Sequence, residues 1–302
     1  MSGDTSTCGI HLDGAFRFMN HVRNSKSKYS SKARSLHRIY FYLRVIDDST
    51  ACRNLDKSTL SPASPEVDFG TALSVSLIDK ESEDDPATSV LSHVTAPRAS
   101  VGEYECVYGV PQSLLILLAR TTDLIDQVES CRTSTGALTQ NLEELCDELE
   151  SDIIDWKPGT SVQTSKSPSA EVIEQNTTAF HNALVIYFAQ HIRLIRYSYL
   201  RTHIETVLNS IEAIEKIKTD SGSSSAPLYW PAFIAGSEAF DAGFQQRFRE
   251  WYVQVETYRL ASVRSGIDVL KQVWKEGPAT GNRTTSQWRI VVQRTGVRLM
   301  LS

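Results

Sequence analysis

The chain has 302 residues, of which 41% are apolar and 22% are charged, and its formal net charge is −5. That length and apolar content are enough to bury a large core. The mildly acidic balance excludes a protein that binds nucleic acid or an anionic membrane through its overall charge.

Cysteine usage and the start of the chain narrow the class further. The five cysteines are scattered and no two have the C-x-x-C spacing, so the sequence predicts neither a disulfide framework nor a zinc site. Residues 1–7 lack the basic start and apolar run of a signal peptide. The longest apolar run, Ser113–Ala119, is far shorter than the roughly 20 residues of a membrane helix. We therefore expect a soluble protein of a reducing, intracellular compartment.

Two helices are predicted in the first block, from Gly9 to Asn54. Apolar residues recur there every three or four positions, which is typical of one buried helix face. Ser30 or Ser31 is placed to cap the second helix. The apolar positions are Leu12, Phe16, Met19 and Val22 in the first helix, and Ala33, Leu36, Ile39, Tyr40, Leu43 and Ile46 in the second.

Residues 56–100 have a different composition. They are rich in Ser, Pro, Asp and Glu with little periodicity, which predicts a disordered, flexible, acidic insertion. A second stretch rich in Ser, Thr and Pro, residues 157–170, is interpreted as a linker. Between them lies a second block of two helices. Pro111 suits the first turn of one, and Asn141 is placed to cap the other.

The third block is predicted to begin with one long helix. Residues 177–218 contain neither Pro nor Gly, and their apolar residues are dense enough for burial on more than one side. A glycine- and serine-rich stretch ends this helix. Further helices are predicted around Phe244–Tyr252 and Val263–Trp274, the second stopped by Gly277.

An apolar segment with two prolines, residues 226–240, separates these helices. Because a proline ring removes a backbone donor and clashes with the preceding turn, we interpret the segment as a packed corner. Pro227 and Pro231 would fix the backbone, while Trp230 and Phe233 would fill the gap between layers. The next helix would then begin around Ile234, and a ligand-facing role stays open as the alternative.

Together these patterns predict an all-α fold, a multi-helix bundle with a disordered acidic and Ser-Pro-rich insertion. No strand alternation and no internal repeat is present in the sequence. A single helical domain, 1–302, is expected.

The segment LYWPAFIAGSEAF, residues 228–240, resembles a motif in the regulatory region of fungal zinc-cluster transcription factors. That motif reads WP-φ-φ-IAG-x-EA, where φ is apolar. Other segments resemble the same region in the expected order, including YGVPQSLL before it and a closing LMLS after it. The similarity covers nearly the whole chain outside the insertion, and it is strongest to the arginine-metabolism-regulator type. The motif residues carried over are Trp230, Pro231, Phe233, Ile234, Gly236, Glu238 and, in a later helix, Trp274.

The resemblance implies a nuclear, non-catalytic regulatory domain of an RNA polymerase II-type transcriptional regulator, controlling a metabolic or biosynthetic gene set. Members of the family carry a DNA-binding zinc cluster of six cysteines, and these residues contain no such cluster, so no cofactor is expected. DNA contact would then be indirect. The implied partners are proteins, either a second copy or a zinc-cluster transcription factor, and a small-molecule effector is compatible with the family.

Residue types that carry chemistry form no recognised motif. The seven histidines, among them His181, His191 and His203, make no H-E-x-x-H or H-x-x-x-H pair, and nucleotide-binding and nucleophile-elbow motifs are absent. The acidic groups Asp47–Asp48 and Glu143–Glu144–Asp147 are interpreted as structural, solvated carboxylates.

Two sets of side chains keep two interpretations each. A basic cluster is either a solvated face or a contact for DNA backbone or an acidic partner. An aromatic set is either core or the lining of an effector pocket. The basic residues are Arg17, Arg23, Lys26, Lys28, Lys32, Arg34 and Arg38. The aromatic residues are Tyr187, Phe188, Tyr197, Tyr199, Trp230, Phe233, Trp251 and Tyr252.

Two other classes of function stay open beside the regulatory one. A helical ligand-binding protein or enzyme would need convergent polar side chains in an apolar pocket, and the sequence indicates none. A truncated, non-functional fragment would have a cysteine-rich, basic reading frame upstream of its start codon.

Overall fold

The computed structural model describes residues 8–25, 30–51, 109–158, 167–223, 225–258, 261–278 and 285–301. Within these ranges the regular structure is helical and no strand occurs, which confirms the all-α prediction. The predicted insertion, residues 56–100, lies outside the described residues. The α-helices are α1 (Cys8–Ser25), α2 (Ser31–Thr50), α5 (Gln112–Thr135), α6 (Gln140–Ile154), α7 (Pro168–Phe188), α8 (Arg201–Ser221), α9 (Tyr229–Ser237), α10 (Ala242–Val255), α11 (Ala261–Glu276) and α12 (Gln287–Thr295).

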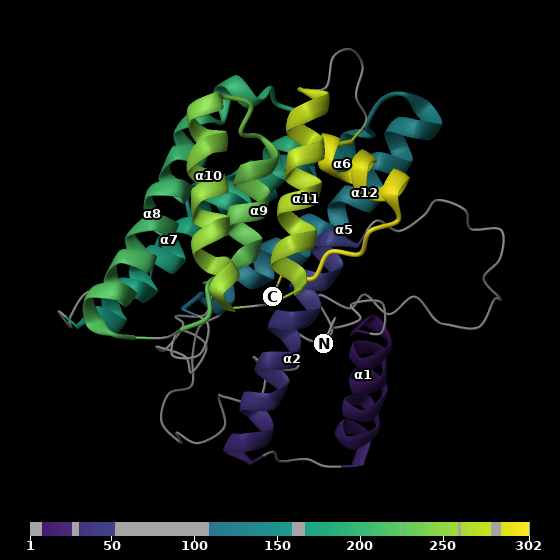
Figure 1. The fold of residues 1–302 in the computed structure, drawn as a ribbon. Helices are drawn as coiled ribbons and strands as arrows, with labels where there is room; N and C mark the ends of the chain where they lie inside the picture. The colour runs from purple at the N-terminus through teal and green to yellow at the C-terminus, as the bar shows by residue number, and fades with distance from the viewer. Residues whose placement is uncertain are drawn as a thin grey trace.

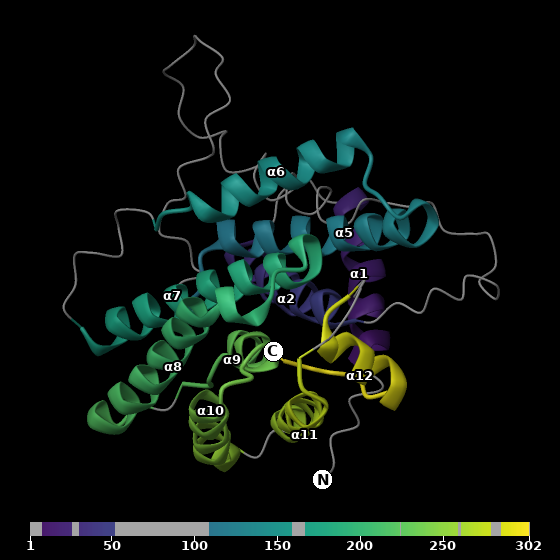
Figure 2. The ribbon, with the colours of Figure 1, turned by 90° about the horizontal axis from the view of Figure 1, so that it is seen from above.

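The short helix α9 lies at the centre of the helical body (Figure 2). It packs against α7, α8, α10 and α11, and every one of its residues is buried. A helix that is apolar on all sides is stable only when other helices surround it. The dense apolar residues of α7 and the aromatic residues of α10 supply that surrounding surface.

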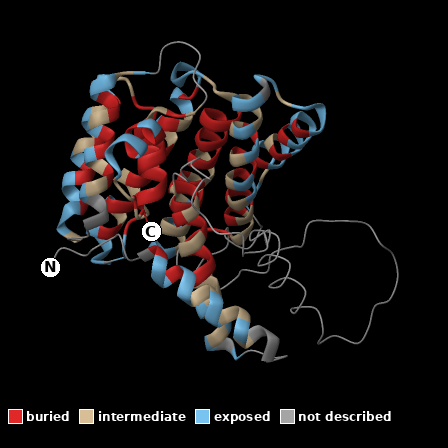
Figure 3. Ribbon diagram, turned by 90° about the vertical axis from the view of Figure 1, so that its right-hand side faces the viewer, coloured by how far each residue is buried: buried red, intermediate tan, exposed pale blue. Residues whose placement is uncertain are grey.

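The helices α1 and α2 form an arm that extends beyond this body (Figure 1). The C-terminal half of α2 packs into the core, whereas no described side chain from Ser30 to Ile39 is buried (Figure 3). The Oγ atom of Ser30 accepts a hydrogen bond from the Ala33 N–H at 3.3 Å, so Ser30 is the cap of α2. The arm is therefore joined to the body at one end only.

The prediction of one long helix over residues 177–218 is wrong. The helix α7 ends at Phe188 and passes into a π-helical segment, Ala189–Arg193. Leu194 then adopts a left-handed conformation with φ of 53°, and α8 begins at Arg201 and packs back along α7. No proline or glycine makes this break, so local sequence did not reveal it. Tertiary contacts to the freed carbonyls, described below, stabilise the turn.

The interpretation of residues 226–240 as a corner is also wrong, because the segment contains α9 itself. Pro231 is the third residue of α9, and a proline is tolerated there since the first amides of a helix have no partner within it. The following helix begins at Ala242, capped by Asp241, and not near Ile234.

Several predicted boundaries shift by a few residues. The N-cap of α6 is Thr139 and not Asn141, and Pro111 occupies the N-cap position just before α5. The helix α7 begins at Pro168, capped by Ser167, so the last residues of the predicted linker are helical. Residues 159–166 of that linker lie outside the described ranges.

Candidate functional site

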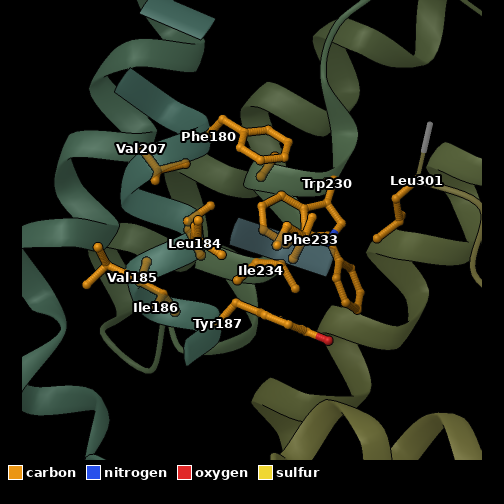
Figure 4. Close-up of a cluster of buried hydrophobic side chains, with 14 of the residues drawn as sticks. Phe180, Leu184, Val185, Ile186, Tyr187, Val207, Trp230, Phe233, Ile234 and Leu301 are labelled. Atoms are coloured by element: carbon orange, nitrogen blue, oxygen red, sulfur yellow. The ribbon is translucent and has the colours of Figure 1, made fainter. Parts of the chain in front are cut away.

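The motif residue Trp230 joins α9 to the end of α2. Its ring is fully buried and stacks on Phe180 with centroids 4.7 Å apart (Figure 4). The indole N–H donates to Ser49 Oγ at 2.9 Å, and the hydroxyl of Tyr187 donates to the Ser49 carbonyl at 2.9 Å. Burial raises the pKa of Tyr187, so the hydroxyl keeps its proton and remains a donor. Ser49 is thus held by two helices at once.

Gly236 and Trp274 join α9 to α11. The indole N–H of Trp274 donates to the Gly236 carbonyl at 2.8 Å. A Cβ atom at Gly236 would lie 2.8 Å from Leu270 Cδ1, closer than real Cβ contacts, so the absence of a side chain permits this approach. On the other side, Phe233 meets the edge of Trp288 in α12 at 5.4 Å between centroids.

The end of α9 carries polar groups into the core. Ser237 donates to the Ile234 carbonyl at 2.7 Å and lies 3.3 Å from Gln190 Oε1 in the π-helical segment. Glu238 follows at 1% exposure, and Pro231 and Ile234 are buried as well. All seven predicted motif residues are therefore buried, and they lie on α9, its C-terminal cap position and α11.

A buried serine and histidine lie next to this motif. His191 Nδ1 donates to the Tyr187 carbonyl at 2.8 Å, which leaves Nε2 as an acceptor for the Ser286 hydroxyl at 2.9 Å. The separation resembles that of a nucleophile and its base, but both side chains are 0% exposed. The hydroxyl of Ser286 therefore fastens the start of α12 to the π-helical segment and does not cap its own helix.

Two arginines stabilise the π-helical segment from outside. Arg132 of α5 donates to the carbonyls of His191 and Ile192, which the π-turn leaves open. Arg193 at its end pairs with Asp147 and with Glu150 of α6, the latter at 2.6 Å. The left-handed Leu194 is a strained conformation for a residue with a Cβ, and these contacts hold it.

A second buried polar group lies where α8, α9 and α10 meet. Glu215 and Lys218 form an ion pair of 2.7 Å with side chains 6% and 4% exposed, and the ammonium lies 5.4 Å from the Tyr258 ring centroid. Nearby, the hydroxyls of Tyr229 and Tyr252 and the Trp251 indole N–H are buried and make no hydrogen bond in the part of the chain that the structure describes. Burial raises the pKa of Tyr229 and of Tyr252.

The aromatic set and the basic cluster identified in the sequence each contain both buried or half-buried and exposed residues. Six of the eight aromatic residues are buried, whereas Tyr197 and Tyr199 are 37% and 78% exposed, so they are not core residues. In the basic cluster, Arg17, Lys32 and Arg34 are exposed on the arm. The side chains of Arg23, Lys26 and Lys28 lie outside the described residues, and Arg38 is half-buried.

The acidic groups serve as ion-pair partners. Asp47 is bound by Arg298 of the C-terminal tail at 2.8 Å, and Asp48 by Arg44 at 2.8 Å. Asp47 is buried, so the prediction that both are solvated is wrong for it. Glu143 and Glu144 are exposed on α6, as predicted.

Neither a metal-binding group nor a membrane-spanning helix is found within the described residues. Across the described ranges, no group of three or more His, Cys, Asp or Glu side chains is placed to hold a metal ion. Among the same residues, no helix combines the length and the apolar character that a bilayer crossing needs.

The partners of the motif were not predicted from the sequence. Ser49, Arg132, Gln190 and Ser286 are polar residues in otherwise ordinary helical patterns, and no spacing connects them. For Lys218 the sequence did contain a signal. Lys218 and Glu215 are three residues apart on a face of α8 that is otherwise mostly apolar. A charged pair on such a face indicates either that the buried face of the helix has been assigned wrongly or that the two charges form a buried ion pair.

Comparison with known proteins assigns the family. Residues 1–302 match the family described as "Fungal specific transcription factor domain". The chain belongs to this family. As a member of the fungal-specific transcription factor domain family it is a transcriptional regulatory domain, and the resemblance inferred from LYWPAFIAGSEAF is confirmed.

A curated relative gives the same indication. The chain is 22% identical over 364 residues to "Arginine metabolism regulation protein II" of Saccharomyces cerevisiae (strain ATCC 204508 / S288c). The match covers 99% of this chain and 41% of the relative, so the chain spans about two fifths of that protein's length. No solved structure matches this fungal-specific transcription factor domain.

Proposed function

We propose that this domain is a non-catalytic, nuclear module that controls a metabolic or biosynthetic gene set together with a partner DNA-binding protein. The match of residues 1–302 to a transcription factor domain family carries the proposal. The name of the curated relative, a regulator of arginine metabolism, supports metabolic genes as the class of target. A net charge of −5 gives these residues no overall attraction to DNA phosphates, so we assign the DNA contact to the partner.

The mechanism is differential binding. A partner or a small-molecule effector that prefers one arrangement of the helices shifts the domain toward that arrangement, and by no more than its difference in affinity. The core around α9 suits such coupling, because Trp230, Gly236 and Ser237 connect it to α2, α11 and the π-helical segment. The left-handed Leu194 next to this segment is a natural place for the backbone to rearrange.

The proposal is tested by recovering the tagged chain from its own cells. Mass spectrometry identifies the proteins that accompany it, and chromatin precipitation on the same sample maps its DNA sites. We expect a DNA-binding protein among the partners and discrete promoter sites. Recovery without a DNA-binding protein and away from chromatin contradicts the proposal. A Trp230→Ala variant, which disrupts the core, is expected to lose both signals, whereas the exposed Tyr199→Ala control keeps them.

A further inference from the structure

The distal arm, residues 9–22 and 30–39, leaves apolar side chains uncovered. Leu36 belongs to the same helical stripe as Tyr40, which is buried, and Leu43, which packs against the core, yet Leu36 is 64% exposed. On the neighbouring helix, Ile10 and Phe18 are 69% and 68% exposed. Two helices alone cannot cover both of their apolar faces, and uncovered apolar residues on a projecting element are typical of an interaction surface.

The same surface is basic. Arg17, Lys32 and Arg34 are exposed there. Asp13 is the only acidic residue between Gly9 and Ile39, and it is bound to Arg44 at 2.6 Å. Lys32 and Arg34 lie in the first turns of α2, where the positive end of the helix dipole disfavours cations. A partner that brings negative charge to this end would relieve that unfavourable arrangement.

The outer face of α6 has the opposite character. The helix packs on α5 and α7 through Leu142, Cys146, Leu149 and Ile153. Residues 140–155 contain seven acidic residues and neither Lys nor Arg. The acidic ridge faces away from the core at helical spacing, and exposed Leu145 and Ile154 flank it at 42% and 56%. The ridge consists of Glu144, Glu148, Ser151 and Asp155, all exposed.

Cations of the same chain neutralise this helix only in part. Arg120 pairs with Asp152 at 2.6 Å and lies 3.9 Å from Glu148. Within the described residues, neither Glu144 nor Asp155 has a cation at ion-pair distance. Asp155 is the C-cap of α6, where the negative end of the helix dipole disfavours an anion. The arm and the acidic ridge therefore carry unfavourable charges of opposite sign at opposite helix ends.

We propose that two copies of this chain associate, with the distal arm of each copy lying on the acidic ridge of the other. The free end of the arm extends away from the body, where a second molecule can reach it (Figure 1). A two-fold dimer makes this contact twice, because each copy supplies one arm and one ridge. Charge complementarity orients the two helices, and the exposed apolar side chains on both surfaces supply buried area. This proposal rests on the proposed function, in which the domain acts by binding other protein chains.

The test uses the purified full chain and two charge-reversal variants. The arm variant is Lys32→Glu with Arg34→Glu, and the ridge variant is Glu148→Lys with Asp155→Lys, all at exposed positions. Lys216→Glu with Lys275→Glu, exposed on α8 and α11, is the matched control. Sedimentation velocity measures the dimer dissociation constant of each protein, and circular dichroism verifies that each is folded.

We expect wild type and the control to dimerise at low salt and to dissociate near 1 M salt, where the screening length is about 3 Å. Each reversal variant alone is expected to dimerise about 30-fold or more weakly, since four pairs change in the two-fold contact. An equimolar mixture of the two variants is expected to regain the dimer, because both contacts of the mixed dimer are complementary. In one contact the acidic arm of the arm variant meets the basic ridge of the ridge variant, and in the other the unchanged basic arm meets the unchanged acidic ridge.

Three results overturn the proposal. They are a wild-type chain that stays monomeric, reversal variants that dimerise like wild type, and a mixture that fails to associate. A monomeric chain that instead binds an acidic helical peptide through the arm assigns the surface to a different partner and likewise overturns it. This measurement needs no transcription, so its failure is distinguishable from failure of the chromatin experiment above.

Discussion

The body around α9 and the distal arm place the same kinds of side chain in opposite settings. In the body, Trp230 and Trp274 bury their rings fully or nearly so, and each indole N–H has an acceptor. In the arm, Phe18 and Leu36 are more than three-fifths exposed, at 68% and 64%. Both regions are helical, and both have apolar stripes at helical spacing.

The difference shows which features of the sequence serve the fold and which remain for a partner. An apolar helix surface that other helices cover on all sides, as in α9, contributes to stability and connects those helices. A stripe that continues past the edge of the body, as in the first half of α2, has no such cover within the described residues. Substitutions in the two regions are therefore expected to separate stability from association.

The largest effect is expected for Trp230→Ala. Removing a fully buried ring that stacks on Phe180 leaves a cavity and takes away the indole donor to Ser49 Oγ, so the free energy of unfolding should fall by about 3–5 kcal/mol. Denaturant titration measures it. The exposed control, Tyr199→Ala, should change it by no more than about 0.5 kcal/mol. Equal losses in the free energy of unfolding for the two variants would contradict the assignment of Trp230 to the core and Tyr199 to the surface.

A pair of glycine substitutions sharpens the same comparison. Gly236→Ala places a Cβ 2.8 Å from Leu270, a fully buried side chain, and should destabilise the fold by about 1–3 kcal/mol. Gly14→Ala on α1 meets no atom within 4 Å and should stabilise it by about 0.5–1 kcal/mol. Both replace a helical glycine with alanine, so opposite signs in thermal unfolding isolate the packing effect. A stabilised Gly236→Ala variant would contradict the close packing of α9 on α11.

A smaller effect on stability is expected for Leu36→Ser. The side chain is 64% exposed, so the free energy of unfolding should change by no more than about 0.5 kcal/mol. The dimer should nevertheless weaken, because this side chain belongs to the proposed contact. Thermal unfolding and sedimentation on the same sample check both expectations. A large loss of stability would place Leu36 in the core instead.

The smallest effect concerns the cap of α10 and depends on pH. The Gly243 backbone N–H, with a contribution from Arg201, holds the pKa of the Asp241 carboxyl below its ordinary value. The carboxylate therefore stabilises the fold above its unfolded pKa of about 3.9, and this is lost as pH falls through the lower folded value. Wild type should have a higher Tm than Asp241→Asn at pH 6, and the gap should close as the pH falls below the unfolded pKa and through the lower folded one. A gap independent of pH would contradict this.

The helices themselves were largely predictable, because apolar spacing determines which face of a helix is buried. The stripe of α10 was recognised in this way and Ser30 was a correct cap, whereas Leu36, assigned to the buried stripe of α2, is 64% exposed. The break after α7 was not predictable, since the donors that stabilise it come from Arg132, far away in sequence. The helix α9 was mistaken for a corner because two prolines outweighed its uniform apolar character.

The candidate site was also predictable only in part. Resemblance to a family located Trp230 and Gly236, but their partners Ser49 and Leu270 depend on which helices meet in three dimensions. Exposure of Tyr199 was likewise hidden, since an aromatic residue beside a buried helix looks the same in sequence whether it turns inward or outward.

The most direct test of a transcriptional regulatory role is reporter transcription in fungal cells. The chain is fused to an unrelated DNA-binding domain whose site lies upstream of the reporter. We expect the fusion to change transcription relative to the DNA-binding domain alone. The Trp230→Ala fusion should lose the effect and the Tyr199→Ala fusion should keep it. A folded wild-type fusion that occupies the site and leaves transcription unchanged would contradict the account.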